Sequence, residues 1–191
     1  MTRGRLEAFS DGVVAIIITI MVLELKVPHE PSFRALLPMW PVFLSYVLSY
    51  VMVGIYWNNH HHLLHVVQHV NGRVLWANLH LLFWLSLLPF VTAWMGETGF
   101  GAVPAFAYGV VLLMAAIAYY LLVRALLALH GSETALARAI GGDFKGRISV
   151  VMYLTALATT FFVPGLALAL YAAVAVVWLV PDRRIEDTLK P

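Results

Sequence analysis

Residues 9–25 read FSDGVVAIIITIMVLEL, and this stretch decides the fold. No charged residue lies between Asp11 and Glu24, and all but two of the residues between them are apolar. A helix needs roughly 20 mainly apolar residues to cross the hydrocarbon core of a bilayer. With the turn before Phe9 the stretch reaches that length, so it predicts a membrane-spanning helix over about residues 6–26, with a polar start.

The composition of the whole chain agrees with a membrane protein. Hydrophobic residues make up 62% of the 191 residues and charged residues 12%, and the mean hydropathy is +0.86. These values exceed what the core of a soluble domain supplies. The sequence contains no cysteine, which excludes disulfides, thiol redox chemistry and thiolate metal sites.

Apolar stretches with few or no charged residues, bounded by charge, Gly or Pro, recur along the chain. They predict helices over about residues 6–26, 35–57, 74–95, 103–129, 148–163 and 166–180. Val163-Pro164-Gly165 separates the last two, because proline and glycine together end a helix. The predicted fold class is an all-α integral membrane protein with six transmembrane helices, and residues 1–191 form a single domain.

The basic residues fall mainly on one side of six such spans. That side receives Arg3, Arg5, Arg73, Arg124, Arg138, Lys145, Arg147, Arg183, Arg184 and Lys190, and the other side receives Lys26 and Arg34. Cytoplasmic loops carry the excess of Lys and Arg, so we expect a multi-pass protein of the cell membrane with both termini cytoplasmic. The excess of basic residues is explained by this orientation, so no nucleic-acid partner is expected.

Two features of the first span are open to more than one interpretation. Ser10 and Asp11 are suited to capping a helix N-terminus, and a charge kept at a membrane boundary equally suits a specific polar partner. A second feature is the stripe of Ile16, Thr19, Ile20 and Leu23, which share one helix face. From spacing alone, this stripe fits packing against neighbouring helices as well as the wall of a pore.

A set of short motifs resembles the endosomal and lysosomal potassium-channel family of transmembrane protein 175, its prokaryotic members most closely. The motifs extend along nearly the whole chain in the family's order. They are Arg5-x-x-x-Phe9-Ser10-Asp11, Trp57-Asn58-Asn59-His60-His61, Asn78, Phe83, Ser86-Leu87-Leu88-Pro89-Phe90, Gly96-Glu97 and Pro181-Asp182-Arg183-Arg184.

The resemblance implies a homotetramer in which four copies of the first helix line a central pore for K⁺ and other monovalent cations. Ile16 would form the narrowest ring, with further rings at Ile20 and Leu23 and the hydroxyl of Thr19 between them. Glu24 would stand at the pore entrance on the non-cytoplasmic side. The sequence has no Thr-Val-Gly-Tyr-Gly loop, so a ring of aliphatic side chains that gates by dewetting would replace a carbonyl filter. No enzyme activity and no cofactor are expected, and a proton leak is expected as a second activity.

The resemblance also implies a polar network at the cytoplasmic end. It would join the turn that holds Phe9 and Ser10 to polar residues of the second and third helices. The candidates are Asn59, His60 or His61, Asn78 and His80, with Arg5 and Asp11 as charged partners. Which histidine is inside stays open. Histidine changes charge near pH 6.5, so conductance is expected to respond to cytoplasmic pH.

Two other classes of protein compete with a channel. His60, His61, His62, His65 and His69 include pairs four residues apart, a spacing that binds metal or haem on a helix, although no Asp or Glu lies between Glu30 and Glu97. A small secondary transporter would instead bind its substrate at mid-membrane near a broken helix, and the Pro164-Gly165 pair is the one sequence hint of this.

Overall fold

The computed structural model describes residues 2–65, 67, 69–131 and 144–179, and this part of the chain is helical apart from its turns and connecting segments. The helices are α1 (Arg3–Leu23), a 3₁₀ helix η1 (Phe33–Met39), α2 (Trp40–His65), α3 (Gly72–Ser86), α4 (Leu88–Glu97), α5 (Ala102–His130), α7 (Phe144–Thr159) and α8 (Pro164–Leu179). The predicted all-α fold class is confirmed. The motif at residues 181–184, Arg138 and Lys190 lie outside the described residues.

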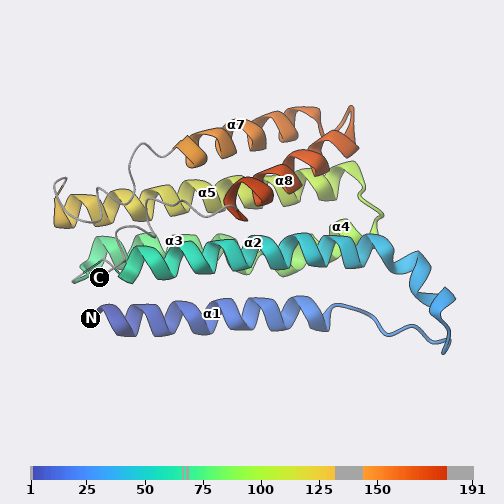
Figure 1. The fold of residues 1–191 in the computed structure, drawn as a ribbon, viewed down its shortest axis with the longest axis horizontal. Coiled ribbons are helices and arrows are strands. Elements are labelled where there is room, and N and C mark those ends of the chain that lie inside the picture. The colour runs from blue at the N-terminus through green and yellow to red at the C-terminus, as the bar shows by residue number, and fades with distance from the viewer. Residues whose placement is uncertain (1, 66, 68, 132–143, 180–191) are drawn as a thin grey trace.

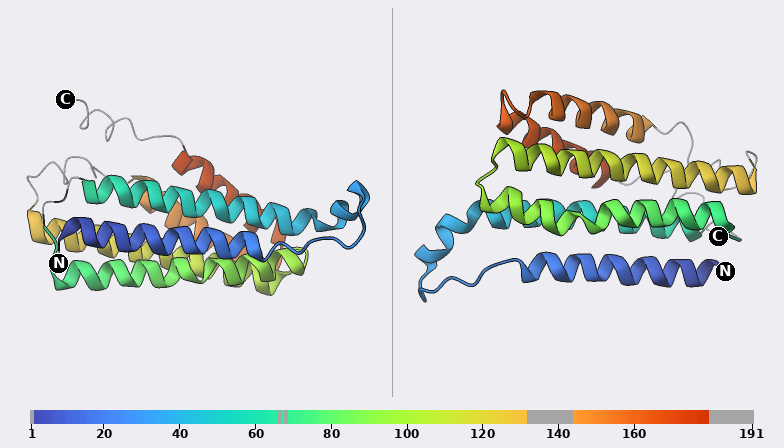
Figure 2. Two further views of the ribbon diagram at one scale, coloured as in Figure 1. Left: turned by 90° about the horizontal axis from the view of Figure 1, so that it is seen from below. Right: turned by 180° about the vertical axis from the view of Figure 1, so that it is seen from behind.

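The helices run along one long axis, with α1 at one side of the bundle and α7 at the other (Figure 1). Seen from the α1 side, α1 lies between α2 and the α3–α4 pair, and it packs on all three (Figure 2). Helix α5 packs on α3 and α4 from the opposite side, and α7 and α8 pack on α5. The N-terminus, the start of α3 and the end of α5 meet at the same end of the molecule (Figure 1).

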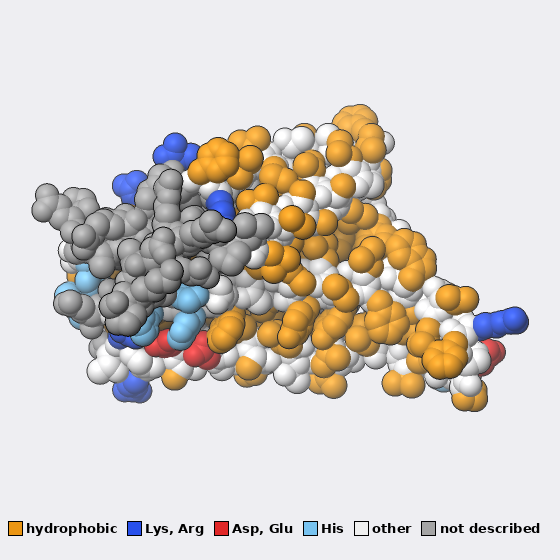
Figure 3. Space-filling model, in the orientation of Figure 1, with side chains coloured by type: hydrophobic (Ala, Val, Ile, Leu, Met, Phe, Trp, Pro, Cys, Tyr) orange, Lys and Arg blue, Asp and Glu red, His pale blue; other side chains and the backbone are white. Residues whose placement is uncertain are grey.

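Within the described residues, four segments are long and apolar enough to cross a membrane: Arg3–Leu23, Phe33–His65, Gly72–Glu97 and Ala102–His130. Helices α7 and α8 have 16 residues each, which is about 24 Å of helix against a hydrocarbon thickness of about 30 Å. On the face shown in Figure 3, hydrophobic side chains fill the middle of the molecule, and charged and histidine side chains gather at its two ends. The protein is therefore a multi-pass membrane protein.

The segment expected as one helix over 74–95 is two helices, α3 and α4, that meet at Leu87. Pro89 at the second position of α4 has no amide hydrogen to donate to the preceding turn, and its ring disfavours a continuous helix there. The chain keeps its direction across the break, so α3 and α4 together form one span (Figure 1).

Two helix ends differ from the sequence-based expectation in ways that affect the site. Helix α1 begins at Arg3 with Thr2 as its N-cap residue, so Ser10 and Asp11 lie inside the helix and do not cap it. Helix α2 continues eight residues beyond the expected end at 57, because the histidines that follow are compatible with a helix. The histidines up to His65 therefore stand on α2 rather than after it.

Hydroxyl groups join α2, α4 and α5 at membrane depth. The Ser49 Oγ lies 2.6 Å from the Thr92 Oγ1 and donates to the Tyr108 hydroxyl at 3.0 Å, and all three side chains are buried. Where water is absent, such hydrogen bonds between helices satisfy polar groups that would otherwise be costly. These hydrogen bonds set the distance between α2 and the helices α4 and α5.

Close packing of α5 against α8 depends on a glycine. The Tyr171 hydroxyl of α8 donates to the Ala105 carbonyl of α5 at 3.1 Å, one turn before Gly109. A Cβ built at Gly109 would lie 2.7 Å from the Tyr171 Cζ and 2.9 Å from the Leu157 Cδ2, which is closer than real Cβ contacts. The absent side chain at this position makes room for Tyr171.

Gly109→Ala is expected to destabilise the fold by about 1–3 kcal/mol, the usual cost of overpacking a core. Thermal unfolding of the purified protein in detergent measures this change. Gly54→Ala is the matched control, because a Cβ at Gly54 in α2 meets nothing within 4 Å. Equal melting temperatures for the two variants would contradict the close α5–α8 contact.

Candidate functional site

Helix α1 has two faces of different character. Its inward face buries Leu6, Ser10, Val14, Ile17 and Met21 against α2, α3 and α4. Its outward face leaves large apolar side chains uncovered: Phe9 is 51% exposed, Ile16 59%, Ile20 42% and Leu23 76%. Within the described part of the subunit, one side of α1 is therefore packed against neighbouring helices and the other side is uncovered.

A buried hydrogen-bonded chain anchors the inward face. The Asn78 side chain of α3, which is fully buried, donates from its Nδ2 to the Ser10 Oγ of α1 at 3.0 Å. Its Oδ1 lies 2.7 Å from the His60 Nε2 of α2, and this ring is also buried. The Ser10 hydroxyl donates to the Leu6 carbonyl at 2.9 Å. One amide thus ties three helices together at a single point.

The residue after Ser10 makes a second link on another side of α1. The Trp57 Nε1 of α2 donates to the Asp11 Oδ1 at 3.0 Å. One turn earlier, the Glu7 carboxylate lies 3.1 Å from the His61 Nδ1. His60 therefore belongs to the buried chain, and the neighbouring His61 faces a carboxylate of α1.

Other residues of the expected network make different contacts. The Asn59 Nδ2 donates to the Ile55 carbonyl of its own helix at 2.8 Å, and the His80 Nε2 accepts from the Trp84 Nε1 of its own helix at 2.9 Å. Arg5 is exposed and makes no hydrogen bond or ion pair with any residue in the described part of the chain, and Phe9 lies on the outward face. Neither Arg5 nor Phe9 contributes to the links between α1 and its neighbours.

Trp57, Glu7 and Arg3 were not predicted as site residues. Trp57 of α2 contacts α1, Glu7 of α1 contacts α2, and Arg3 of α1 contacts the C-terminal end of α2. The spacing of residues along α1 gives a signal for Arg3 and Glu7. Arg3, Glu7 and Asp11 are four residues apart, so they share one side of α1.

The outward stripe includes one polar side chain. The Thr19 hydroxyl donates to the Ala15 carbonyl at 2.9 Å, so its proton is used within the helix and its oxygen lone pairs remain available. Thr19 is exposed between Ile16 and Ile20, and Glu24 is exposed directly after the helix ends at Leu23. The stripe is thus apolar with one hydroxyl oxygen as acceptor, and a carboxylate follows its C-terminal end.

An ion pair fastens the connection that follows α1. The Lys26 ammonium donates to the Glu97 carboxylate at the end of α4. This hydrogen bond and the Glu97 charge raise the pKa of Lys26 above its ordinary value, so Lys26 stays protonated at neutral pH. The pair is solvent-exposed and links the segment after α1 to the end of α4.

The histidines give no metal centre in the described part of the chain, where no three His, Asp or Glu side chains converge. His61 and His65 keep the spacing of four residues on α2, with ring centroids 6.2 Å apart, but their nearest charged neighbours are Glu7 and Arg3 of α1. The geometry favours interhelical contacts over metal or haem ligation.

Comparisons with known proteins agree with this architecture. Residues 5–89 match the family model of the endosomal/lysosomal potassium channel TMEM175. A potassium channel from Chryseobacterium sp. (strain P1-3) is 55% identical over 190 residues, which cover 100% of this chain and 99% of that protein. The human endosomal/lysosomal proton channel TMEM175 is 35% identical over 96 residues, 44% of this chain and 19% of that protein.

A solved structure resembles nearly the whole fold. The crystal structure of a lysosomal potassium-selective channel TMEM175 homolog from Chamaesiphon minutus has a TM-score of 0.81 and 30% sequence identity, and the match covers 93% of this chain and 96% of that one. The chain belongs to the TMEM175 channel family, which confirms the predicted resemblance. A channel family also agrees with the expectation that the protein is not an enzyme.

Replacing Asn78 tests the buried chain. Asn78→Leu keeps the branched shape but leaves Ser10 without its donor and His60 without its partner, so we expect a loss of about 1–3 kcal/mol in stability. Unfolding in detergent measures the loss. Asn59→Leu is the matched control and should cost clearly less, because the Asn59 amide bonds only to its own helix. Equal losses would contradict the proposed anchor.

Proposed function

We propose that this protein is a K⁺-permeable cation channel in which copies of α1 surround a central pore. The observation that supports it is the division of α1: Asn78 and Trp57 tie it to the neighbouring helices, and its outward face presents Ile16, Thr19, Ile20 and Leu23. The relative from Chryseobacterium sp. is named a potassium channel and the solved homologue a potassium-selective channel. A homotetramer would bring four such outward faces together.

The stripe would act as a constriction. Rings of Ile16, Ile20 and Leu23 would narrow the pore to an apolar passage that closes by dewetting. K⁺ sheds its hydration water more readily than Na⁺, so a dry passage favours K⁺. The lone pairs of Thr19 would replace part of the lost water between the two isoleucine rings.

The charge distribution supports an orientation. The side chains of Arg3, Arg73 and Lys145 belong to the end where α1 and α3 begin, and Lys26 and Arg34 belong to the opposite end. By the positive-inside rule the first end is cytoplasmic. Glu24 would then stand at the outer entrance, where a ring of carboxylates concentrates cations.

Ile16→Asn is expected to wet the constriction and to raise Na⁺ current relative to K⁺ current. The reversal potential under bi-ionic conditions, measured in liposome patches, reports the change. Val22→Asn is the matched control, because Val22 is exposed on the same helix but lies about a third of a turn from Ile16 around it. A reversal potential that stays unchanged in Ile16→Asn would refute Ile16 as the constriction.

A reconstituted K⁺ flux assay separates a channel from a transporter. A channel gives flux that follows the electrochemical gradient at all K⁺ concentrations tested, and a transporter gives saturable flux that requires a counter-ion. Absence of K⁺ flux in protein that is folded and inserted would overturn the proposal.

A proton leak is the second candidate activity, because the vertebrate relatives are named proton channels. A pH-sensitive dye inside the same liposomes, with K⁺ permeability supplied by an ionophore, measures it. Proton flux equal to that of protein-free liposomes would exclude this activity.

A further inference from the structure

The cytoplasmic halves of α1 and α2 meet along a row of three polar contacts. Each step of four residues along α1 is matched by a step of four residues back along α2. The pairs are Asp11 with Trp57, Glu7 with His61, and Arg3 with His65. Such a register places three side chains of each helix on the facing sides of two antiparallel helices. We call this row of three pairs the polar ladder.

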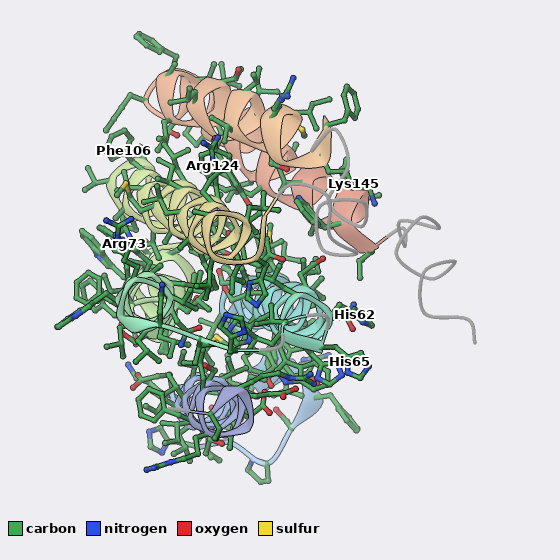
Figure 4. All side chains as sticks on the ribbon, turned by 90° about the vertical axis from the view of Figure 1, so that its left-hand side faces the viewer. His62, His65, Arg73, Phe106, Arg124 and Lys145 are labelled. Atoms are coloured by element: carbon green, nitrogen blue, oxygen red, sulfur yellow. The ribbon has the colours of Figure 1, made fainter. Side chains whose placement is uncertain are left out.

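Each outer rung has a hydrogen bond that forms whatever the charge of a histidine ring. The Trp57 indole is always a donor, and the Asp11 carboxylate accepts from it. At the other end, the Arg3 guanidinium donates to the carbonyls of His65 at 2.9 Å and Val67 at 3.3 Å, just at and beyond the C-terminus of α2. A cation there pairs with free carbonyls of the helix end. Figure 4 shows His65 on the side of α2 that faces α1.

The middle rung is different, because it is an ion pair only when His61 carries a proton. The Glu7 side chain is 19% exposed and the His61 side chain 44% exposed, so the pair is partly shielded and within reach of solvent protons. Arg3 also lies 3.9 Å from the second Glu7 oxygen.

We propose that Glu7 and His61 are positioning residues for the pore helix, and that a cytoplasmic proton on His61 tightens the hold of α2 on α1. This inference deepens the proposed function, since the helix that is held is the one that would line the pore. The groups that face His61 in the described part of the chain are Glu7 and Arg3 from α1, and the rings of Trp57, His62 and His65 from its own helix.

The expected direction follows from the charges. With a proton on both nitrogens of its ring, His61 is an imidazolium and forms an ion pair with the Glu7 carboxylate. Without that extra proton the ring is neutral, and the rung is at most a hydrogen bond from a neutral donor to the carboxylate. The rung therefore contributes most when His61 is protonated and loses strength as rising pH removes that proton.

A double-mutant cycle at two pH values tests the rung in the full-length protein. Wild type, Glu7→Gln, His61→Gln and the double variant are unfolded thermally in detergent near pH 6 and near pH 8. We expect a coupling of about two- to fivefold in the unfolding constant near pH 6, as for a partly exposed ion pair, and a smaller one near pH 8. The control cycle uses Glu7 and His69→Gln, because His69 packs against His130 instead, and should show no coupling.

K⁺ flux in liposomes links the rung to the pore. Wild-type flux is expected to change by about two- to fivefold between cytoplasmic pH 6 and 8, and each of Glu7→Gln and His61→Gln should flatten that profile, unlike His69→Gln. Coupling of equal size at both pH values, or a pH profile retained in both variants, would overturn the inference. If wild type shows no flux at any pH, the proposed function fails, and the unfolding cycle still decides whether the rung exists.

Discussion

The hydrogen bonds from Asn78 to Ser10 and to His60 hold three helices at one point, and the rest of the arrangement depends on them. A carboxamide without partners at this depth is costly, because the bilayer offers no water to replace a lost bond. The serine, the amide and the imidazole therefore have to meet, and their meeting sets the register of α1 against α2 and α3. In the same way, the hydroxyl contacts of Ser49 with Thr92 and Tyr108 set the register of α2 against α4 and α5.

Anchoring on one side is what leaves the other side of α1 available. A helix that was apolar all round would gain as much from burying one face as another. The polar residues of the inward face remove that choice, because turning α1 would strand Ser10 and Asp11 and would bury the stripe of Ile16 and Ile20. The specificity of the packing thus comes from a few polar contacts, whereas the bulk of the stabilisation comes from apolar surface.

Much of this could be predicted from the sequence, since hydropathy and charge mark the spans and the motifs indicate the family. Which of the two histidines lies inside the site could not be predicted. His60 and His61 are adjacent and about 100° apart around a helix, so the choice depends on how far α2 continues beyond residue 57 and on its rotation. The break at Leu87 was missed because apolar residues continue on both sides of it, although Pro89 is its visible cause. The partners of Asp11 and Glu7 come from another helix, and spacing within α1 alone does not identify them.

Ser10 and Asp11 are consecutive, yet one is tied through Asn78 to α3 and the other through Trp57 to α2. Two ties in different directions at one level oppose both rotation and sliding of α1, and a small tilt about this level changes these two ties least. Asp11 then acts as a pivot. At a rise of 1.5 Å per residue, Ile16 stands about 7.5 Å beyond the pivot and Leu23 about 18 Å beyond it. A given tilt displaces Leu23 more than twice as far as Ile16, so in the proposed pore the Leu23 side chains would move most and the Ile16 side chains least.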